Sequence, residues 1–460
     1  MRAAVIIDYQ MVKHDIESFG GKGDGVTDNS AAFAKAFLTI RESGGGILRV
    51  GKGTWKTGPL EIFSHTTLEL DEGALVSFIP DPALYPPVWT RWEGVECHAM
   101  HPCVFASGQK DIAIVGKGAL DGKGRYWWDR YREKRRKGQT LPETPEEIAL
   151  AELNRGFEGQ PGGGGGREMQ FLRPPLVQFF ECSDVRLEGV TLKNSPFWTL
   201  HPVYCTGVSI MGLTIFNPND SVNTDAIDVD SCQNVVIEGC NLSVGDDGIT
   251  LKSGSGEDGI RVGRPCRDIR IKGCTVEDGH GGIVIGSETA AGIFDVQAED
   301  CIFRGTDRGI RIKTRRGRGG RIENLDFRGL TMENNLCPVV INMFYKCGAS
   351  PSDAYFSQEA LPVGITTPQV RNVRIRDVRA TGCRASAGFF AGLPESPVED
   401  LDISRCEFFV DEQSETRPVE SDMFFGVPDT PEKGIRLLNV KGPRFNDISV
   451  QGATRVFVFG

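Results

Sequence analysis

The chain has 460 residues and a formal net charge of −10, with 39% hydrophobic and 25% charged residues. This balance is typical of a folded globular protein and excludes a disordered chain. No run of about 18 apolar residues occurs, so no membrane span is predicted.

The N-terminal stretch MRAAVIIDYQMVKHD lacks the long apolar core and the small-residue cleavage site of a secretory leader. The thirteen cysteines are an odd number scattered along the chain, unlike those of a secreted disulfide scaffold. These features predict a cytoplasmic protein. A periplasmic or secreted location stays the alternative if a leader has been removed.

Two segments differ from the rest of the chain, which we predict to be a single domain over residues 1–460. Residues 28–46, DNSAAFAKAFLTIRESGGG, have helical spacing and a glycine stop, and are predicted to cap one end of the fold. Residues 130–170 are predicted to be an insertion. Within it, Thr144, Pro145 and Glu147 indicate a capping box and a short helix, and GQPGGGGG indicates a flexible loop.

A short phrase recurs through the middle of the chain. It reads CSDVRLEGVTL from 182, CTGVSIMGLTI from 205, CQNVVIEGCNL from 232 and CRDIRIKGCTV from 266, with fainter copies from 111, 295, 324, 372 and 400. The phrase alternates apolar and polar residues as a strand does, and its copies lie 23 to 34 residues apart. No helix long enough for a crossover lies between them. An all-β parallel solenoid is therefore predicted, with coils stacked at roughly 4.8 Å. Its ladder would contain Val185, Val208, Val235, Ile269, Val296 and Leu325.

The cysteines follow the same register. Four lie three residues before these markers and four lie five residues after them, and no CxxC pair occurs. We therefore predict small buried core residues rather than zinc ligands. The two ladders would contain Cys182, Cys205, Cys232 and Cys266, and Cys240, Cys274, Cys301 and Cys406.

Four polar phrases interrupt successive coils: NTDAIDVD (223–230), GDDG (245–248), GHGG (279–282) and RIK (311–313). Asp246 and His280 each lie eleven residues after a marker, and Asp225 and Lys313 each lie seventeen after one. Stacking is therefore predicted to gather carboxylates, an imidazole and two cations on one side of the solenoid.

This combination indicates acid–base chemistry on an anionic substrate. The glycines around Asp246 and Asp247 indicate a kink that turns both side chains towards a cleft. Crowded carboxylates raise one another's pKa, so that one can hold a proton while another is ionised, as glycoside hydrolysis requires. His280 is predicted to tune the acid. Arg311 and Lys313 alternate on one strand, face the same side and suit a carboxylated substrate.

In this order, the four phrases resemble the signature of glycoside hydrolase family 28, the polygalacturonases and their relatives. FGGKGDGVTDNSAAF resembles the entry phrase of pectin-degrading right-handed β-helices, and FIPDP, TRWEG, LRPPLVQF, NSPFWTLHP and IVIGSE resemble bacterial exo-acting members. The resemblance implies a right-handed parallel β-helix that hydrolyses α-1,4-linked galacturonic acid from the non-reducing end. It implies inversion of configuration, a pectic polysaccharide or oligosaccharide as partner, and neither metal nor cofactor.

The resemblance also implies residue roles. Asp246 would be the general acid assisted by His280, and Asp225 and Asp247 would hold and activate water. Arg311 and Lys313 would bind the sugar carboxylate. Ala226 departs from the family, which has glycine after the first aspartate. Asp228 is predicted to support the site, and further substrate contacts are assigned to Asn223, Trp198, His201, Arg91, Glu93, Arg173 and Glu288.

Other functions stay open. A rhamnogalacturonan or xylogalacturonan hydrolase fits the same phrases, and a calcium-dependent lyase or a non-catalytic carbohydrate-binding solenoid fits the same fold. The segment DRGIRIKTRRGRGGR has the look of a nucleic-acid tail, but the acidic chain and the absence of interleaved aromatic residues oppose that function. We predict instead that Arg315, Arg316, Arg318 and Arg321 line a loop and extend a positive field that attracts a polyanion. The oligomeric state stays open.

Overall fold

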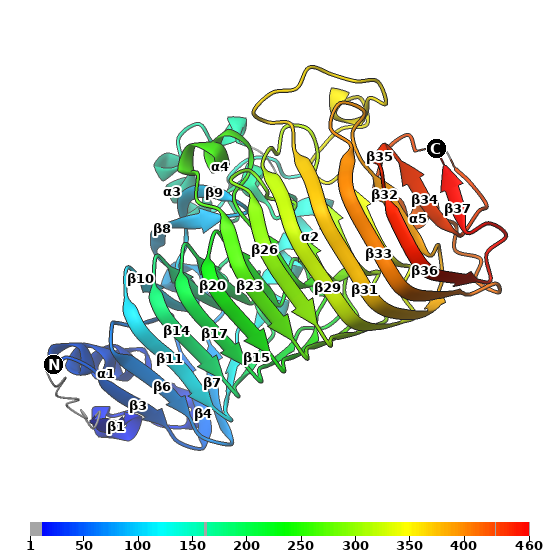
Figure 1. The fold of residues 1–460 in the computed structure, drawn as a ribbon. Helices are drawn as coiled ribbons and strands as arrows, with labels where there is room; N and C mark the ends of the chain where they lie inside the picture. Colours follow the sequence, from blue (N-terminus) through cyan, green and yellow to red (C-terminus); the bar gives the residue numbers. More distant parts are fainter. Residues whose placement is uncertain (1–11, 161–162, 428, 460) are drawn as a thin grey trace, which may run out of the picture.

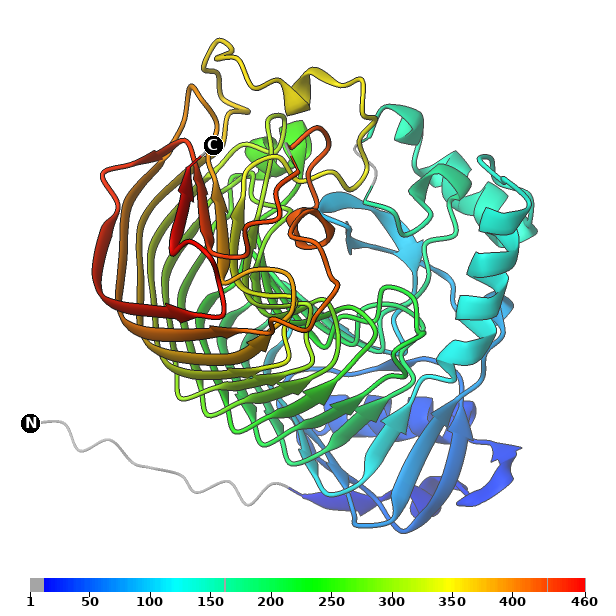
Figure 2. The same ribbon diagram turned by 90° about the vertical axis from the view of Figure 1, so that its right-hand side faces the viewer.

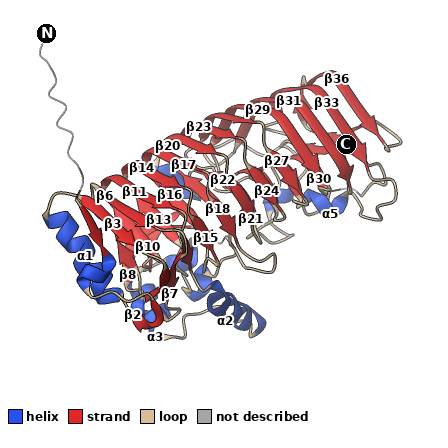
Figure 3. Cartoon of the chain, turned by 90° about the horizontal axis from the view of Figure 1, so that it is seen from below, coloured by secondary structure: helices blue, strands red, loops and turns tan. Residues whose placement is uncertain are grey.

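The computed structural model describes residues 12–160, 163–427 and 429–459, which form the predicted right-handed parallel β-helix (Figure 1). Short strands stack in parallel along the axis (Figure 3), and the view along the axis shows coils enclosing one continuous core (Figure 2). The prediction that the chain begins without a leader concerns mainly residues 1–11, which lie outside the described residues. Pro161 and Gly162 of the glycine-rich loop also lie outside them.

The strands form three ladders. The first comprises β1 (Lys13–Asp15), β3 (Gly46–Val50), β6 (Thr66–Leu70), β11 (Lys110–Gly116), β14 (Ser183–Glu188), β17 (Thr206–Met211), β20 (Gln233–Glu238), β23 (Cys266–Lys272), β26 (Ile293–Glu299), β29 (Arg321–Glu333), β31 (Gln369–Cys383), β33 (Val398–Val410), β35 (Val440–Lys441) and β36 (Arg444–Gln451). The second comprises β2 (Asp24–Asp28), β4 (Gly53–Thr57), β7 (Ala74–Phe78), β12 (Ala119–Asp121), β15 (Thr191–Lys193), β18 (Thr214–Phe216), β21 (Asn241–Ser243), β24 (Thr275–Glu277) and β27 (Ile302–Arg304), and β29 continues it. The third comprises β5 (Leu60–Glu61), β10 (Val104–Ser107), β13 (Val177–Phe180), β16 (Leu200–Val203), β19 (Ile227–Asp230), β22 (Asp247–Lys252), β25 (Gly281–Ile285), β28 (Arg308–Lys313), β30 (Cys337–Asn342), β32 (Gly388–Ala391), β34 (Ile435–Leu438) and β37 (Phe457–Phe459).

The predicted register of the repeated phrase is confirmed. Each marker residue pairs directly with the marker of the next coil, and the fainter copies join the same ladder. In order, the paired residues are Ile112, Val185, Val208, Val235, Ile269, Val296, Leu325, Val373 and Leu401. The unequal spacing of the copies is therefore absorbed by the connections between strands.

The cysteines behave as predicted core residues. All thirteen are free thiols, and all except the half-buried Cys347 are buried. Within the first predicted ladder, the backbone N–H of Cys205 donates to Sγ of Cys232 at 3.3 Å. The thiols thus stack beside the valine, isoleucine and leucine side chains of the interior.

Helix α1 (Ser30–Glu42) lies within the predicted cap segment at the N-terminal end of the solenoid (Figure 1). It buries Phe33, Phe37 and Ile40 and contacts β3, β5 and β6. Because the end of a solenoid would otherwise expose its core to water, this apolar helix face shields the first coils.

The segment around the predicted insertion contains two helices. Helix α3 (Pro145–Leu153) has the predicted capping box, in which Thr144 and Glu147 bond reciprocally. Helix α2 (Gly124–Arg136) was not predicted and buries Trp127 and Trp128. The shorter elements are α4 (Gly256–Val262), α5 (Val419–Asp422), η1 (Ile16–Phe19), η2 (Pro82–Leu84), η3 (Phe157–Gly159), η4 (Arg167–Met169) and η5 (Ala354–Phe356). No helix in the described part of the chain has the length and hydrophobicity needed to span a bilayer.

An antiparallel hairpin of β8 (Pro87–Trp92) and β9 (Val95–Met100) stands beside the third ladder. A small apolar cluster on β10, β13 and β16 packs against Val88 of this hairpin and Val262 of α4. The hairpin and α4 therefore cover the N-terminal part of the ladder and leave a hollow over the strands that follow.

Candidate active site

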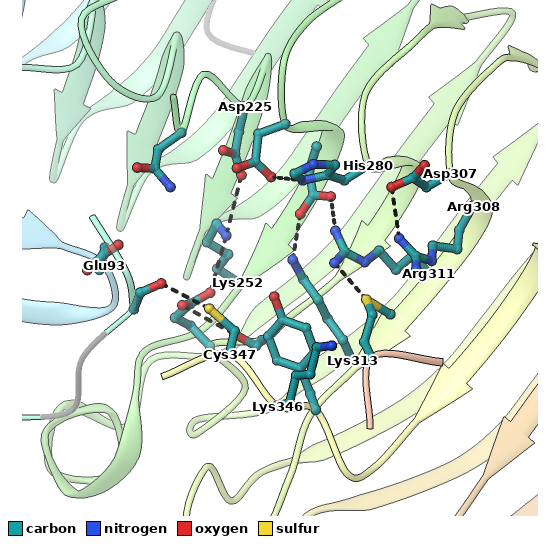
Figure 4. Close-up of a pocket in the computed structure, with 18 of the residues that line it drawn as sticks. Glu93, Asp225, Lys252, His280, Asp307, Arg308, Arg311, Lys313, Lys346 and Cys347 are labelled. Carbon is teal, nitrogen blue, oxygen red and sulfur yellow. Dashed lines mark hydrogen bonds and ion pairs between the residues drawn. The ribbon is translucent and has the colours of Figure 1, made fainter. Parts of the chain in front are cut away.

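This hollow is a pocket of about 410 Å³ over the third ladder (Figure 4). It contains all four predicted catalytic residues. The lining residues are Glu93, Gly163, Trp198, Asn223, Asp225, Asp246, Asp247, Lys252, His280, Ser287, Glu288, Asp307, Arg308, Arg311, Lys313, Tyr345, Lys346, Cys347 and Met423.

The stacked coils bring the acids together. Ile227, Ile249, Ile283 and Ile310 form a buried ladder, and Asp225 and Asp247 each lie two residues before its members. Asp246 and His280 occupy equivalent positions, as predicted, and the His280 N–H donates to the Asp246 carbonyl at 2.8 Å.

The predicted equivalence of Asp225 and Lys313 is wrong. Lys313 lies three residues after the isoleucine of its coil, whereas Asp225 lies two residues before its own. Counting from the markers fails because the connection from β18 to β19, which precedes Asp225, is longer than the connection from β27 to β28, which precedes Lys313. Both side chains nevertheless reach the pocket, from opposite ends of their strands.

Glycines allow the backbone to approach closely enough for this arrangement. A Cβ on Gly245 would lie 2.5 Å from the Ser221 carbonyl oxygen, and one on Gly248 would lie 2.8 Å from the Gly282 carbonyl oxygen. A Cβ on Gly281 would lie 3.1 Å from Cδ of Arg311. The glycines thus permit the bend that presents both Asp246 and Asp247, and leave room for Arg311 to pass.

Asp247 is bound by the two predicted cations. Lys313 Nζ lies 2.6 Å from its carboxylate, and Arg311 donates to the other oxygen. Burial would raise the pKa of Asp247, but Arg311 and Lys313 outweigh it and hold this pKa well below its usual range. Asp247 thus supplies a counter-ion within the protein, and the predicted binding of a sugar carboxylate by Arg311 and Lys313 stays a prediction.

Asp246 pairs with the half-exposed His280. His280 Nδ1 lies 3.0 Å from Oδ1 of Asp246. Burial would raise the pKa of Asp246, but the charge and hydrogen bond of His280 lower it, and Asp246 in turn raises the pKa of His280. The pair therefore holds a proton beside the ionised Asp247.

Asp225 belongs to a second group of acids. Burial and the nearby Asp228 raise the pKa of Asp225 well above its usual range, and burial raises the pKa of Asp228 to about 8. Asp228 lies behind the pocket wall, in the supporting position predicted for it. The carboxyl groups are thus divided into protonated and ionised ones, as predicted. The raised pKa belongs to Asp225 rather than to Asp246.

Lys252 was missed by the sequence analysis. Its Nζ lies 3.2 Å from Glu288, 3.4 Å from Asp228 and 3.9 Å from Asp225, and the side chain is buried. It also lies 4.4 Å from the ring centroid of Trp198, which lines the pocket as predicted. The alternation of the strand could have identified Lys252, because it lies on the face opposite to that of Ile249 and Leu251.

Three predicted substrate contacts do not line the pocket. His201 is buried beside Trp198, and its Nδ1 accepts a hydrogen bond from Gln178 at 2.8 Å. Arg91 is buried in an ion pair of 2.8 Å with Asp230. Arg173 is also buried, and it donates to Oδ1 of Asn223 at 3.0 Å. Arg173 and His201 thus contact the pocket residues Asn223 and Trp198 from behind, whereas Arg91 does not. Asn223, Glu93 and Glu288 line the pocket.

The remaining arginines of the basic segment do not form the predicted positive loop surface. Arg315 is buried and donates to the Cys347 carbonyl at 2.7 Å, Arg316 is buried against Glu395, and Arg318 is buried against Ser255. Their guanidinium groups satisfy loop carbonyls and carboxylates. Arg321 is more exposed and pairs with Glu323 at 3.8 Å.

Several pocket residues carried no motif signal. Arg308 lies on β28 and donates to Asp307 at 3.1 Å, while Lys346 is exposed on the loop after β30. That loop also places Tyr345 near Arg311 and Lys313. Ala226, the departure from the family pattern, is buried in the core, and its N–H donates to the Asp247 carbonyl at 2.9 Å.

The pocket is ill-suited to a metal ion. Asp246, Asp247 and His280 offer potential ligand atoms within 4.8 Å of one another. Arg311 and Lys313 already neutralise Asp247, however, and Nδ1 of His280 is directed to Asp246. A cation at this point would be repelled by two buried positive charges.

Comparison with known proteins agrees with the site. A family model described as glycosyl hydrolases family 28 matches residues 164–412. A Vitis vinifera protein named "Probable polygalacturonase" is 31% identical over 84% of this chain and 72% of its own length. A Dickeya chrysanthemi protein named "Exo-poly-alpha-D-galacturonosidase" is 28% identical over 79% of this chain, which spans 62% of that protein. The solved structure of a hyperthermoactive exopolygalacturonase from Thermotoga maritima has 33% sequence identity and a TM-score of 0.73, over 86% of this chain and 87% of its own.

Proposed function

Because the chain belongs to glycosyl hydrolases family 28 and is therefore a glycoside hydrolase, we propose that it hydrolyses α-1,4-linked galacturonic acid in pectic polymers or oligomers. We propose release of single sugars from the non-reducing end. The names of the Dickeya and Thermotoga relatives support this mode of action.

The observation that carries the proposal is the charge arrangement at the centre of the pocket. An ionised Asp247 lies beside an Asp246–His280 pair that holds a proton, so a base and an acid stand together. Five cationic side chains line the same pocket, which suits a uronic acid better than a neutral sugar. They are Lys252, Arg308, Arg311, Lys313 and Lys346.

The reaction follows as a single displacement with inversion. His280 Nδ1–H transfers its proton to the ionised Asp246 through their hydrogen bond, and Asp246 passes a proton to the leaving oxygen. Asp247 takes the proton of the attacking water, and Asp225, whose raised pKa keeps it neutral, orients that water. Water's oxygen bonds to the anomeric carbon as the glycosidic bond breaks.

Exo action is supported by the closed N-terminal side of the pocket. The tip of the β8–β9 hairpin supplies Glu93, and the glycine-rich loop supplies Gly163. A chain bound across Asp246 and Asp247 meets this wall on one side, whereas Arg308 and Lys346 lie on the other.

Product analysis tests the proposal. We expect polygalacturonate to release monomer as its only small product from the first time points. Trigalacturonate should first give monomer and dimer in equal amounts, and the new reducing end should have inverted anomeric configuration by NMR. A ladder of oligomers would contradict exo action. If the activity is lost on addition of a chelator and the product absorbs as an unsaturated uronide, the reaction is β-elimination rather than hydrolysis.

The role of Asp246 has its own test. Asp246→Asn should lower kcat by about 10³-fold, because general acid catalysis contributes about 10² to 10⁴. An aryl galacturonide, whose leaving group needs no proton, should be affected much less. An equal loss of kcat on both substrates would show that Asp246 is not the general acid.

We also propose a cytoplasmic location, which the free thiols of all thirteen cysteines support, since thiols persist in reducing compartments. Imported oligogalacturonides would then be the substrate. Fractionation of the native host with compartment markers tests this, and recovery in the periplasm or the medium would contradict it.

A further inference from the structure

Glu93 lies at the tip of the β8–β9 hairpin and lines the end of the pocket (Figure 4). Trp92 pairs with Val95, so the turn has two residues, Glu93 and Gly94, with φ of 45° and 75°. Turns of this kind favour asparagine followed by glycine, because both residues need positive φ. Glutamate at the first position is therefore a strained choice, and strain of this kind accumulates at functional sites.

The carboxyl group of Glu93 is only half satisfied. Oε1 accepts a hydrogen bond from the Gly165 N–H at 2.8 Å, whereas Oε2 is buried without a partner among the described residues, and Glu93 is 4% exposed. An unpaired buried oxygen costs about 1–3 kcal/mol. Burial also raises the pKa of Glu93 to about 7. The strained turn and the desolvated carboxyl group of Glu93 thus both cost folding free energy.

The glycine-rich loop is shaped around this carboxyl group. A Cβ on Gly163 would lie 2.6 Å from Cδ of Glu93, and one on Gly165 would lie 2.5 Å from Oε1. Cys347 bonds the Gly163 carbonyl at 3.3 Å and so fastens the loop to the opposite wall. The glycines let the loop close tightly over the carboxyl group while its second oxygen stays available.

We propose that Glu93 recognises the end of the substrate chain through a hydrogen bond between Oε2 and the free 4-hydroxyl group of the terminal sugar. In every interior sugar of an α-1,4-linked chain this oxygen is part of a glycosidic bond and carries no proton. Glu93 therefore selects chain ends and makes the pocket exo-specific. This inference rests on the proposed galacturonide hydrolysis and names the residue that sets its specificity.

The neighbouring groups leave Glu93 as the free partner at this wall. Glu288 is engaged by Lys252 at 3.2 Å and by Arg318 at 3.6 Å. Asn223 accepts from Arg173 at 3.0 Å. Glu288 and Oδ1 of Asn223 are thus already bonded, and a hydroxyl group that reaches the end of the pocket meets Oε2 of Glu93.

The test compares trigalacturonate with its analogue in which the terminal non-reducing sugar is 4-deoxy. A site that hydrogen-bonds a hydroxyl group rejects an analogue without it, and we expect wild type to show a kcat/KM ratio of about 100. Glu93→Asn withdraws the polar group by one methylene, and the ratio should fall to about 3 or less. Its Tm should be equal or higher, because asparagine relieves the turn. Glu93→Gln keeps length and hydrogen bonding, so its ratio should stay above about 10.

Glu96→Gln is the matched control. Glu96 lies on the same hairpin but bonds Arg261 and Tyr204 outside the pocket, so the wild-type ratio should persist. A wild-type ratio near 1, or an unchanged ratio in Glu93→Asn, would overturn chain-end recognition by Glu93. Failure of wild type to cleave ordinary trigalacturonate would instead overturn the proposed function.

Discussion

The two sides of the pocket differ in charge and in the protonation of their carboxyl groups. On the N-terminal side, Glu93, Asp225 and Asp228 have raised pKa values, and Lys252 is shared among several acids. On the C-terminal side, Asp247 alone is bound by both Arg311 and Lys313, and Arg308 and Lys346 add positive charge. Burial penalises a charged carboxylate unless a cation compensates. The distribution of cations therefore decides which acids keep protons and which are ionised.

This asymmetry suits an anionic chain that is processed from one end. Under the proposed function, the cationic side attracts the polymer and binds its carboxylates. The opposite wall, with neutral carboxyl groups, offers hydrogen bonds to hydroxyl groups and closes the pocket. His280, which is bonded to Asp246, lies between them (Figure 4).

The strongest way to break this contrast is to remove Arg311. Arg311→Ala leaves the buried Asp247 with Lys313 alone, so we expect a loss of about 3–5 kcal/mol of stability. Asp247, the proposed base, is then no longer firmly ionised, so kcat should fall by about 10³-fold. Calorimetry and kinetics measure both. Arg304→Ala, an exposed arginine paired with Glu277 and Glu333, is the control and should change neither. Wild-type kcat in Arg311→Ala would refute the assigned role of Asp247.

Removing Lys252 should have a smaller effect. In Lys252→Met, Asp225 and Asp228 already favour their protonated forms and tolerate the loss, so we expect about a tenfold fall in kcat. Because the pKa of Asp228 is already about 8 in the wild type, a further rise in the variant costs stability only above about pH 8, and the Tm deficit should grow there.

The double variant Asp228→Asn with Lys252→Met removes an acid together with the cation. It should recover most of the Tm deficit, because one fewer carboxyl group must be buried without a counter-charge. A deficit that is independent of pH, or no recovery in the double variant, would show that Lys252 acts by packing alone.

The pH dependence of KM should distinguish the two sides further. As pH rises through about 7, Glu93 ionises and adds negative charge at the wall, so the KM of trigalacturonate should rise about fivefold by about pH 8.5. The groups that face Glu93 keep their charge over this range, since the pKa of Arg173 is about 10 and that of Glu288 about 2. The facing groups are Arg167, Arg173, Glu288 and Tyr131.

Glu93→Gln should abolish this rise, because the amide does not titrate. Steady-state kinetics over the same pH range provide the measurement. A rise that persists in the variant would assign the titration to another group.

The smallest effect is expected at Lys346, the exposed cation of the pocket. Lys346→Gln should raise KM for polygalacturonate about threefold at low salt and leave kcat unchanged. Near 1 M salt, where screening acts over about 3 Å, the difference should vanish. Lys272→Gln, an exposed lysine on β23 paired with Glu299, should have no effect at either salt concentration. A salt-independent defect would indicate direct binding rather than attraction.

The repeat was readable from sequence because its cause is local and periodic. Each coil must turn apolar side chains inward, so Val185, Val208 and Val235 recur in phase, and the cysteines follow. The four polar phrases were readable for the same reason, since breaks in an apolar period stand out. The pairing of Asp246 with His280 follows directly from equal spacing within similar coils.

Tertiary structure decided what depends on unequal connections and on insertions. The longer loop before Asp225 moved it out of register with Lys313, and burial under hairpin and loops turned Arg91, Arg173 and His201 away from the pocket. Arg315, Arg316 and Arg318 found carbonyl and carboxylate partners far along the chain instead of solvent. The sequence by itself determined the solenoid and the acids that it stacks. Which acid meets which cation, and hence which of them holds a proton, was decided only by contacts between distant segments, because desolvation and charge pairing depend on distances that no local pattern records.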